Sequence, residues 1–267
     1  MVGIEEQSMS ELLDLSGKSA VITGGAMGLG YAISRRLGRA GAQVLISDKN
    51  LKAVENSARR LTEDGCEIIA MQADVSEEGD VGRIFQYALE NLNGVDILVN
   101  NAGIYPKSGI IDLDTKEWDH VLNVNLRGTF LCCREAARQM VAQKRGGAII
   151  NISSIDALHP SQAGLAHYDS SKAGVDGMTR NLALELAPHD IRVVTVNPGA
   201  ILTDGVKKSA SLTLDLKDFY EAFEAKIPMG RMGRPDDVAR LVLFLASGAN
   251  TYITGASIII DGGVLLN

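Results

Sequence analysis

The sequence predicts a doubly wound α/β domain, in which helices cover both faces of a parallel sheet. Two observations indicate this fold class. Short apolar runs of strand length alternate with longer helical patterns, an order typical of parallel sheets with right-handed crossovers. The first apolar run, Lys18–Thr23, also ends in a glycine-rich turn that leads directly into a helical pattern. With 267 residues the chain can bury a substantial core, and little of it remains for a second domain.

Composition argues against several classes of protein. Hydrophobic residues make up 46% of the chain, a normal share for a globular protein, and no apolar run reaches the length of a membrane span. The formal net charge of −7 argues against a general nucleic-acid surface. The three cysteines form no Cys-x-x-Cys pair, and the four histidines show no metal-ligand spacing. We therefore expect a cytoplasmic protein with reduced thiols, no metal, and no nucleic-acid or membrane partner.

Residues 1–14 are expected to be a mobile lead-in that the folded domain does not need. They carry Glu5, Glu6, Glu11 and Asp14, and they lack the basic patch and apolar segment of a signal peptide. The domain itself is expected to span residues 15–267.

The glycine-rich turn is the first candidate binding site. Gly24, Gly28 and Gly30 lie between the first strand and a helical pattern over Tyr31–Ala40. This context points a helix N-terminus at a phosphate, and glycines let the backbone approach that phosphate closely. The spacing differs from the usual G-x-G-x-x-G fingerprint of dinucleotide-binding proteins. The expected cofactor contacts in this turn are Thr23, Gly24, Met27, Gly28, Leu29 and Gly30.

Asp48 is the candidate residue for recognising the adenosine ribose. It ends the predicted strand Gln43–Ser47, 24 residues after Gly24. A carboxylate at this place can accept hydrogen bonds from the ribose hydroxyls and repels a 2′-phosphate, so the sequence favours NAD over NADP. The neighbouring Lys49, also an expected cofactor contact, can offset part of that repulsion. The alternative is that Asp48 only caps a turn.

The strand and helix patterns continue beyond Asp48. They are expected at Leu51–Asp64 (helix), Glu67–Gln72 (strand), Asp80–Leu92 (helix) and Ile97–Val99 (strand).

Two further strand ends carry candidate cofactor contacts. Asp74, with Val75 beside it, can bind the adenine amino group, or it can cap the helix that starts near Glu77, and both roles are compatible. The small residues and paired amides after Val99 suit a turn packed beside a cofactor. The contacts expected from that turn are Asn101, Ala102 and Gly103.

Tyr168 and Lys172 form the candidate catalytic pair. Four residues apart at the start of a predicted helix, they share one helix face. A neighbouring ammonium favours the phenolate and is expected to lower the tyrosine pKa from about 10 towards working pH. A tyrosine tuned in this way can exchange a proton with an alcohol oxygen. Many helices contain this spacing by chance, so the pair indicates catalysis only in combination with the other motifs.

Three motifs together resemble those of the short-chain dehydrogenase/reductase family. They are Thr23-Gly24-x-x-x-Gly28-x-Gly30, Asn100-Asn101-Ala102-Gly103 and Tyr168-x-x-x-Lys172, and each is modest alone. Their order and intervals are highly specific, and the resemblance covers Leu15 to Gly263. It implies a Rossmann-like single domain with about seven parallel strands, and hydride transfer between a nicotinamide dinucleotide and an alcohol or ketone.

The resemblance also implies a catalytic tetrad of Asn125, Ser154, Tyr168 and Lys172. Asn125 lies in a predicted helix over Trp118–Cys133, where a local break would free a backbone carbonyl to hold a water of a proton relay. Ser154 follows the strand Gly147–Ile152 and would bind the substrate oxygen. Lys172 would hold the nicotinamide ribose, besides lowering the pKa of Tyr168.

The last third of the chain is expected to supply a clamp for the nicotinamide. After the strand Arg192–Val196, the resemblance implies that Pro198 and Gly199 cover the ring and that Thr203 binds the carboxamide, with Ile201 as a further contact. A substrate lid is expected at about residues 204–227. A helix over Asp236–Ala246 and a buried, β-branched strand within residues 254–263 are expected to complete the domain.

The substrate is the least determined part of the prediction. Asp156, His159 and Gln162, in the loop between Ser154 and Tyr168, favour a sugar, a polyol or a hydroxylated ring. Leucine and phenylalanine residues of the lid favour a cyclic alcohol or a hydroxysteroid. The resemblance further implies a homo-oligomer, either a tetramer or a dimer.

We therefore predict an NAD-dependent dehydrogenase that interconverts a secondary alcohol and a ketone. One alternative is an NADPH-dependent 3-oxoacyl-thioester reductase of the same family, which predicts a basic residue near the glycine turn. Ala26 and Met27 stand there instead, and Asp48 opposes this reading. An alternative of another class is a dinucleotide-sensing protein without catalysis. Such proteins typically lose the tyrosine or the lysine, and this chain has both.

Overall fold

A parallel sheet forms the centre of the molecule. The computed structural model describes residues 7–203 and 224–267, and within them the sheet has seven strands in the order β3-β2-β1-β4-β5-β6-β7. Every strand pair is parallel, as the alternation of strand and helix patterns predicts. The strands are β1 (Ser19–Thr23), β2 (Gln43–Asp48), β3 (Ile68–Gln72), β4 (Ile97–Asn100), β5 (Gly147–Ile152), β6 (Ile191–Pro198) and β7 (Ser257–Ile260).

The order of the strands reverses between β1 and β4. Ala20 of β1 pairs with Val44 of β2 on one side and with Ile97 of β4 on the other, so the chain winds outward from β1 in both directions. In open parallel sheets, ligands bind outside the carboxyl ends of the strands at such a switch point. The motifs of the sequence follow β1, β2, β4, β5 and β6, and their residues therefore gather along one edge.

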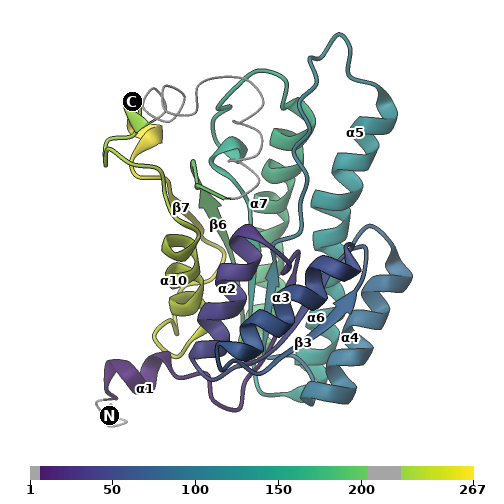
Figure 1. The fold of residues 1–267 in the computed structure, drawn as a ribbon, viewed down its shortest axis with the longest axis vertical. Helices are drawn as coiled ribbons and strands as arrows, with labels where there is room; N and C mark the ends of the chain where they lie inside the picture. Colours follow the sequence, from purple (N-terminus) through teal and green to yellow (C-terminus); the bar gives the residue numbers. More distant parts are fainter. Residues whose placement is uncertain (1–6, 204–223) are drawn as a thin grey trace.

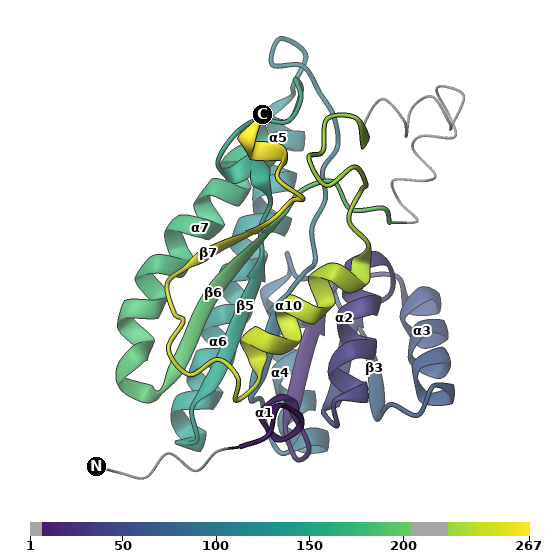
Figure 2. The same ribbon diagram turned by 90° about the vertical axis from the view of Figure 1, so that its left-hand side faces the viewer.

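Helices cover the sheet on both faces, which confirms the predicted Rossmann-like fold class. Figures 1 and 2 show three helices side by side on one face, α2 (Gly28–Arg39), α3 (Leu51–Glu63) and α10 (Pro235–Ala246). The other face is covered by α4 (Glu78–Leu92), α6 (Gly128–Gln143) and α7 (Ala166–Leu186). Short helical segments at Ile155–Ala157 (η2), Ala187–His189 (η3) and Val264–Leu266 (η4) complete the assignment.

Two apolar layers hold the helices to the sheet. Successive side chains of a strand point to opposite faces, so Ile22 packs beneath α2 and α10 whereas Val21 packs beneath α4 and α6. Both are fully buried. Burial of each Leu or Ile side chain contributes about 1.5–3 kcal/mol to folding. These layers make the sheet edge a rigid platform for the motifs above it.

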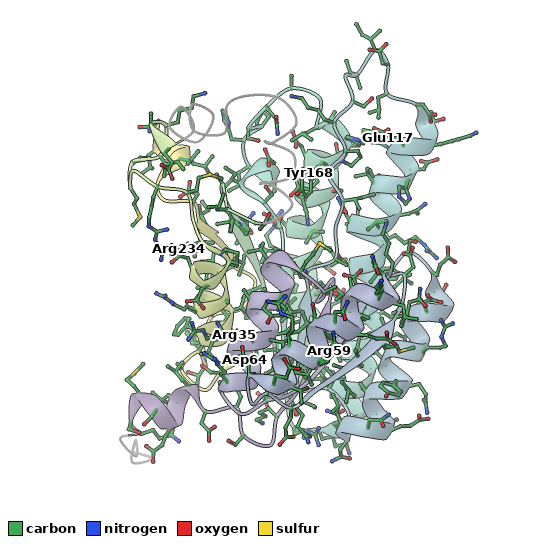
Figure 3. The ribbon with its side chains drawn as sticks, viewed as in Figure 1. Arg35, Arg59, Asp64, Glu117, Tyr168 and Arg234 are labelled. Carbon is green, nitrogen blue, oxygen red and sulfur yellow. The ribbon has the colours of Figure 1, made fainter. Side chains whose placement is uncertain are left out.

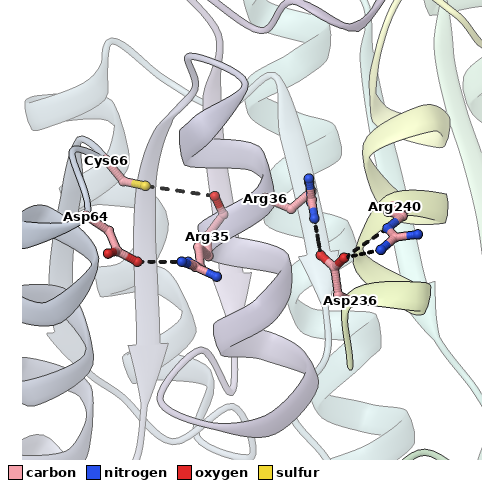
Figure 4. Close-up of polar contacts among 6 residues, drawn as sticks. All are labelled: Arg35, Arg36, Asp64, Cys66, Asp236 and Arg240. Carbon is pink, nitrogen blue, oxygen red and sulfur yellow. Dashed lines mark hydrogen bonds and ion pairs between the residues drawn. The ribbon is translucent and has the colours of Figure 1, made fainter. Parts of the chain in front are cut away.

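Ion pairs join the three helices of the first face (Figure 4). Asp236 of α10 accepts hydrogen bonds from Arg36 of α2 and from Arg240 one turn further along α10. Arg35 donates from its Nε to Asp64 at 2.8 Å, just beyond the end of α3. Asp236 also lies in the first turn of α10, where the helix dipole favours a negative charge.

Replacing Asp236 with asparagine is expected to lower the free energy of unfolding by about 1 kcal/mol at pH 7, since partly exposed ion pairs are screened by water. Its arginine partners lower the pKa of Asp236 in the folded state. The stabilisation is therefore complete above the unfolded pKa of about 3.9 and is lost as the pH falls through the lower, folded value. Urea unfolding of both proteins at pH 7 and near pH 3 would measure this. An equal difference at both pH values would contradict an electrostatic origin.

The structure adds detail to two predicted elements and differs from a third. Residues 9–13 of the expected lead-in form a short helix, α1 (Met9–Leu13), because Ser8 and Glu11 complete a capping box. The single helix predicted over Trp118–Cys133 is divided into α5 (Thr115–Leu122), a π-helical turn η1 (Asn123–Arg127), and α6. Finally, β7 lies at the edge of the sheet and is not fully buried: the side chain of Ile259 is 47% exposed.

In the described parts of the chain, no helix is both long enough and apolar enough to cross a membrane.

Candidate active site

The turns after β1 and β4 are locked together. The Thr23 hydroxyl accepts the backbone N–H groups of Asn101 and Ala102, both at 3.1 Å. In return, the Asn101 amide Nδ2 donates to the carbonyls of Thr23 and Gly24, at 3.1 and 2.9 Å. Gly24 adopts a φ of +62°, and a Cβ atom at this position would lie 2.8 Å from the Ala102 Cα. The two turns thus fit closely only because Gly24 has no side chain.

The N-terminus of α2 opens beside this locked turn. Met27, the N-cap residue, makes no side-chain hydrogen bond to the helix, so side-chain capping leaves the first N–H groups of α2 available for an anion. A Cβ atom on Gly28 would have the Thr203 methyl at 3.6 Å as its nearest neighbour, and one on Gly30 would overlap the Gly24 carbonyl. Gly28 and Leu29 are partly exposed, whereas Gly30 is buried. A narrow cradle whose first helical N–H groups have no side-chain cap from Met27 fits a dinucleotide pyrophosphate.

Asp48 and Asp74 lie at the carboxyl ends of neighbouring strands. Asp48 ends β2, and its Oδ1 accepts the Asn50 N–H at 3.0 Å. Its Oδ2 has no hydrogen-bond partner among the residues that the structure describes. The turn-capping contact considered as an alternative therefore involves one of the two carboxylate oxygens. Lys49 beside it is exposed.

Asp74 stabilises a turn instead of capping a helix. Its Oδ1 accepts the N–H and the hydroxyl of Ser76, at 2.9 and 2.7 Å. Burial acts to raise the pKa of Asp74, but these hydrogen bonds and Lys49 outweigh it and the pKa is lowered. The N-cap of α4 is Glu77, so the predicted capping role of Asp74 is wrong. Val75 is buried against Gly128.

Ser154 follows the carboxyl end of β5 and is held from two sides. Its carbonyl accepts the Asn197 side-chain amide at 2.9 Å, and its hydroxyl donates to Asp156 Oδ2 at 2.8 Å. The backbone N–H of Asp156 donates back to the Ser154 hydroxyl at 3.1 Å. These contacts hold the Ser154 hydroxyl near the Tyr168 phenol, whose pKa it acts to lower.

Tyr168 and Lys172 lie in the first two turns of α7, as their spacing predicts. The buried Lys172 Nζ donates to the Ile152 carbonyl at 2.8 Å and lies 5.7 Å from the centre of the Tyr168 ring. The ring of Tyr105 packs edge-on against Tyr168, with 6.0 Å between ring centres. Figure 3 shows Tyr168 in the half of the molecule away from α1, at the end where the strands finish.

The pKa of Tyr168 is raised in this structure, not lowered as the sequence predicts. Burial is the largest cause, and the carboxylates of Asp156 and Asp169 add to it, whereas a hydrogen bond with Ser154 opposes it. The prediction placed the Lys172 ammonium close to the phenol, but the ammonium is directed at the Ile152 carbonyl. A lower pKa therefore requires further positive charge near the phenol.

Burial also lowers the pKa of Lys172, to about 8. The carboxylate of Asp176 opposes this shift. Neutral pH lies only a little below this pKa, so the Lys172 side chain is charged there but loses its proton at slightly higher pH.

Asn125 lies in the π-helical turn η1, where the predicted helix break occurs. Its side chain is buried and forms a paired bridge to Ile104, with Oδ1 accepting the N–H and Nδ2 donating to the carbonyl, both at 2.8 Å. Nδ2 also donates to the Ser171 hydroxyl at 3.0 Å. The Asn125 carbonyl, predicted to hold a water, accepts the Thr129 hydroxyl at 2.7 Å.

The predicted substrate contacts divide into two groups. Asp156 lies against Ser154, and its Oδ1 accepts the Ser161 N–H at 2.8 Å. His159 and Gln162 lie on an exposed part of the loop, where Gln162 accepts a hydrogen bond from Lys107 at 3.3 Å. The structure therefore brings Asp156 into the site and leaves the other two at its rim.

The predicted nicotinamide clamp starts where β6 ends. Pro198 is the last residue of β6, and a Cβ atom on Gly199 would lie 2.7 Å from Asp261 Cβ. Ile201 is buried and bridges to Gly233, while Thr203 lies next to Gly28. Most of the predicted lid, residues 204–223, lies outside the described residues, and residues 224–227 lead into the loop before α10.

Two residues of the site were missed by the sequence analysis. Asn197 donates to the Ser154 carbonyl and to Asp176 Oδ2, and Asp176 is buried one helical turn beyond Lys172. Spacing would have revealed Asp176, since Tyr168, Lys172 and Asp176 follow one another at intervals of four on one helix face. Asn197 has no comparable signal, because its role depends on a contact across 43 residues of sequence.

A phosphate cradle next to a buried lysine, a tyrosine and a serine suits redox chemistry on a small alcohol or ketone. The fold and the site thus define a dinucleotide-binding oxidoreductase. Comparison with known proteins narrows this class. The family model described as enoyl-(acyl carrier protein) reductase matches residues 24–265.

Curated relatives align over nearly the whole chain. A 3β-hydroxysteroid dehydrogenase 1 of Eggerthella lenta is 40% identical, with 95% of each chain covered. An L-rhamnose 1-dehydrogenase (NAD(P)(+)) of Azotobacter vinelandii is 37% identical, with 94% of this chain and 97% of the relative covered. A 3-oxoacyl-acyl-carrier-protein reductase of Aquifex aeolicus is 36% identical, with 94% and 99% covered.

Among solved structures, a short-chain type dehydrogenase/reductase from Mycobacterium marinum superposes with a TM-score of 0.91 at 38% identity. The match covers 97% of this chain and 100% of that one. The chain belongs to the short-chain dehydrogenase/reductase family.

Proposed function

We propose that this protein is an NAD-dependent dehydrogenase that interconverts a secondary alcohol and a ketone. The observation that carries the proposal is the grouping of Ser154, Tyr168 and Lys172 at the sheet edge that also holds the glycine cradle. When bound, NAD supplies the hydride acceptor for oxidation of the alcohol.

Each residue of the site has a separate task in this proposal. The Tyr168 phenolate takes the hydroxyl proton of the alcohol, and Ser154 holds the same oxygen by a hydrogen bond. Lys172 stabilises the phenolate and grips the nicotinamide ribose. Asn125, through its carbonyl and its bridge to Ile104, keeps a path for protons between Lys172 and solvent.

The other contacts proposed for the cofactor divide among three regions. Thr23 and Asn101 shape the glycine cradle, and Asp48 binds the adenosine ribose. The remaining contacts are proposed for Gly24, Met27, Gly28, Leu29, Gly30, Lys49, Asp74, Val75, Ala102, Gly103, Pro198, Gly199, Ile201 and Thr203.

Asp48 supports NAD as the cofactor, and its replacement tests this. Because a carboxylate repels a 2′-phosphate, we expect Asp48→Ser to raise kcat/KM for NADP relative to NAD by about tenfold or more. Steady-state rates with both cofactors would measure the ratio, with Lys49→Gln as the companion variant. A wild-type preference for NADP that Lys49→Gln abolishes would contradict the assignment and give Lys49 the phosphate-binding role.

The charges beside Tyr168 favour a neutral substrate. Asp156 and Asp169 both act electrostatically on the phenol, so an anionic group next to the reacting carbon would be repelled. Neutral sugars or polyols, cyclic alcohols and hydroxysteroids satisfy this condition. The relatives named for a 3β-hydroxysteroid and for L-rhamnose support two of these classes.

A second candidate is an NADPH-dependent 3-oxoacyl-thioester reductase. The family model's description and the relative from Aquifex aeolicus favour it. Asp48 and the absence of a basic residue at positions 26 and 27 oppose it.

A substrate panel distinguishes the two candidates. The rate of formation of reduced nicotinamide would be measured with NAD and with NADP against polyols, sugars, cyclic alcohols, hydroxysteroids and 3-hydroxyacyl thioesters. Turnover of a neutral alcohol with NAD supports the proposal. Turnover of thioesters alone, with NADP alone, would replace it by the second candidate. Tight NAD binding without any turnover would favour the dinucleotide sensor.

We further propose a cytoplasmic homo-oligomer, a dimer or a tetramer. The exposed Ile259 on the edge strand β7 and the exposed Leu266 after it support an association surface at this end of the sheet.

A further inference from the structure

Asp176 is a buried carboxylate that the proposed mechanism does not use. Its side chain is 3% exposed, although a charged group is almost never buried without a partner. It lies on α7 one turn beyond Lys172, which itself lies one turn beyond Tyr168. The three side chains therefore form a row along the helix face that packs towards the sheet.

Hydrogen bonds hold Asp176 to both neighbouring strands. Its Oδ2 accepts the Asn197 amide of β6 at 3.0 Å and the Ser257 hydroxyl of β7 at 3.2 Å. The second proton of the same amide reaches the Ser154 carbonyl at 2.9 Å. The Asn197 side chain alone thus connects Asp176 to the turn that carries Ser154.

The other oxygen of this carboxylate, Oδ1, is buried and has no hydrogen-bond partner in the described part of the chain. A tether between strands needs only the two bonds to Oδ2, which a neutral amide oxygen would accept equally well. The cost of burying the additional charge is offset if a buried cation lies nearby. Lys172 is such a cation: it is 5% exposed, it lies one helical turn from Asp176, and the Asp176 carboxylate acts to raise its pKa.

We propose that Asp176 is a positioning residue of the active site, a buried counter-ion that keeps Lys172 charged while it fixes the turn bearing Ser154. The groups that lie near Lys172 come from its own helix and from the neighbouring sheet edge. α7 contributes Tyr168 and Asp176, β5 contributes the Ile152 carbonyl, and the turn after β4 with η1 contributes Gly103 and Asn125. Tyr168 and Asp176 are the ionisable side chains among these, and Asp176 is the carboxylic acid.

The proposal rests on the proposed dehydrogenase function, in which the charged form of Lys172 is active. A lysine is charged below its pKa, and removal of a neighbouring carboxylate lowers that pKa. Because the Lys172 pKa lies below the raised Tyr168 pKa, kcat/KM is expected to rise with pH and to level off where Lys172 loses its proton. In Asp176→Asn this levelling is expected at least one pH unit lower, with the plateau rate about tenfold lower for each unit of displacement and little change in rate well below it.

Two readouts and one matched variant test this. Titration of Lys172 by NMR of protein with ¹⁵Nζ-labelled lysine, assigned with Lys172→Met, reports its protonation without any substrate. We expect a midpoint near pH 8 in the parent, where the lysine pKa is about 8, and a midpoint at least one unit lower in Asp176→Asn. Glu185→Gln removes the same charge from the exposed face of α7 and should leave the midpoint unchanged. An unchanged midpoint in folded Asp176→Asn overturns the proposal.

A second variant separates the counter-ion from a simple tether, and it serves also if Asp176→Asn does not fold. Ser257→Ala deletes one hydrogen bond to Asp176 and keeps the charge. The proposal predicts an unchanged Lys172 midpoint in Ser257→Ala, and a downward shift there would overturn it. Absence of any turnover by the parent protein would contradict the dehydrogenase function, whereas the NMR titration would still decide the role of Asp176.

Discussion

Replacing Tyr168 with phenylalanine is expected to lower kcat/KM for alcohol oxidation by about a thousandfold or more. General acid–base groups typically contribute factors of 10²–10⁴, and Tyr168 is the group to which the proposed function assigns this proton transfer. The variant keeps the ring that packs against Tyr105, so folding and the affinity for NAD should change little. Steady-state kinetics, with NAD binding followed by protein fluorescence or calorimetry, would separate the two effects.

Tyr105→Phe is the matched control. It also deletes one phenolic hydroxyl, from an exposed ring in edge contact with Tyr168. We expect kcat/KM to stay within about threefold, since the ring packing is kept. If both variants lost activity equally, the loss would reflect disturbed packing, and Tyr168 would have no special role in proton transfer.

The raised pKa of Tyr168 gives this prediction a pH dependence. Oxidation requires the phenolate, which forms above the tyrosine pKa, so kcat/KM should rise with pH until Lys172 loses its proton. Burial and two carboxylates raise the pKa of Tyr168 in the free protein. The positive charge of Lys172 acts in the opposite direction. A rate independent of pH from 6 to 9 would contradict proton transfer by Tyr168.

The fold was predictable because each of its signals is local. An apolar run of five or six residues, a turn and an amphipathic helix can be recognised within about 30 residues, and parallel pairing follows from their repetition. The glycine turn and the Tyr168–Lys172 pair are equally local. Because the carboxyl ends of parallel strands share one edge, the fold class also predicted that the glycine turn and the Tyr168–Lys172 pair lie near each other.

Properties that depend on distant contacts were not predictable in this way. The exposure of Ile259 depends on β7 having no neighbour on its outer side, which no pattern in residues 254–263 reveals. The direction of the Tyr168 pKa shift depends on burial and on where the Lys172 ammonium points. The role inferred for Asp176 depends on its hydrogen bonds with Asn197 and Ser257, which are 21 and 81 residues away in the sequence.

Replacing Gly30 with alanine is expected to weaken NAD binding by at least about a hundredfold and to lower the free energy of unfolding by about 1–3 kcal/mol. The new Cβ atom would overlap the Gly24 carbonyl oxygen and would lie 2.6 Å from Asn101 Nδ2. Both groups belong to the lock between the turns after β1 and β4, and neither is the flexible end of a long side chain. Overpacking a rigid site typically costs 1–3 kcal/mol. The displaced turn would also lose its fit to the pyrophosphate.

Gly82→Ala is the matched control for this steric argument. Gly82 also lies within a helix, α4, but a Cβ atom there would meet nothing within 4 Å. Because alanine is the better helix former, this variant is expected to raise the free energy of unfolding by about 0.5–1 kcal/mol and to bind NAD normally. Urea unfolding and NAD titration of both variants would measure the contrast. Normal NAD binding by Gly30→Ala would mean that the cradle can open to admit a methyl group, and the pyrophosphate would then have to be assigned to another part of the sheet edge.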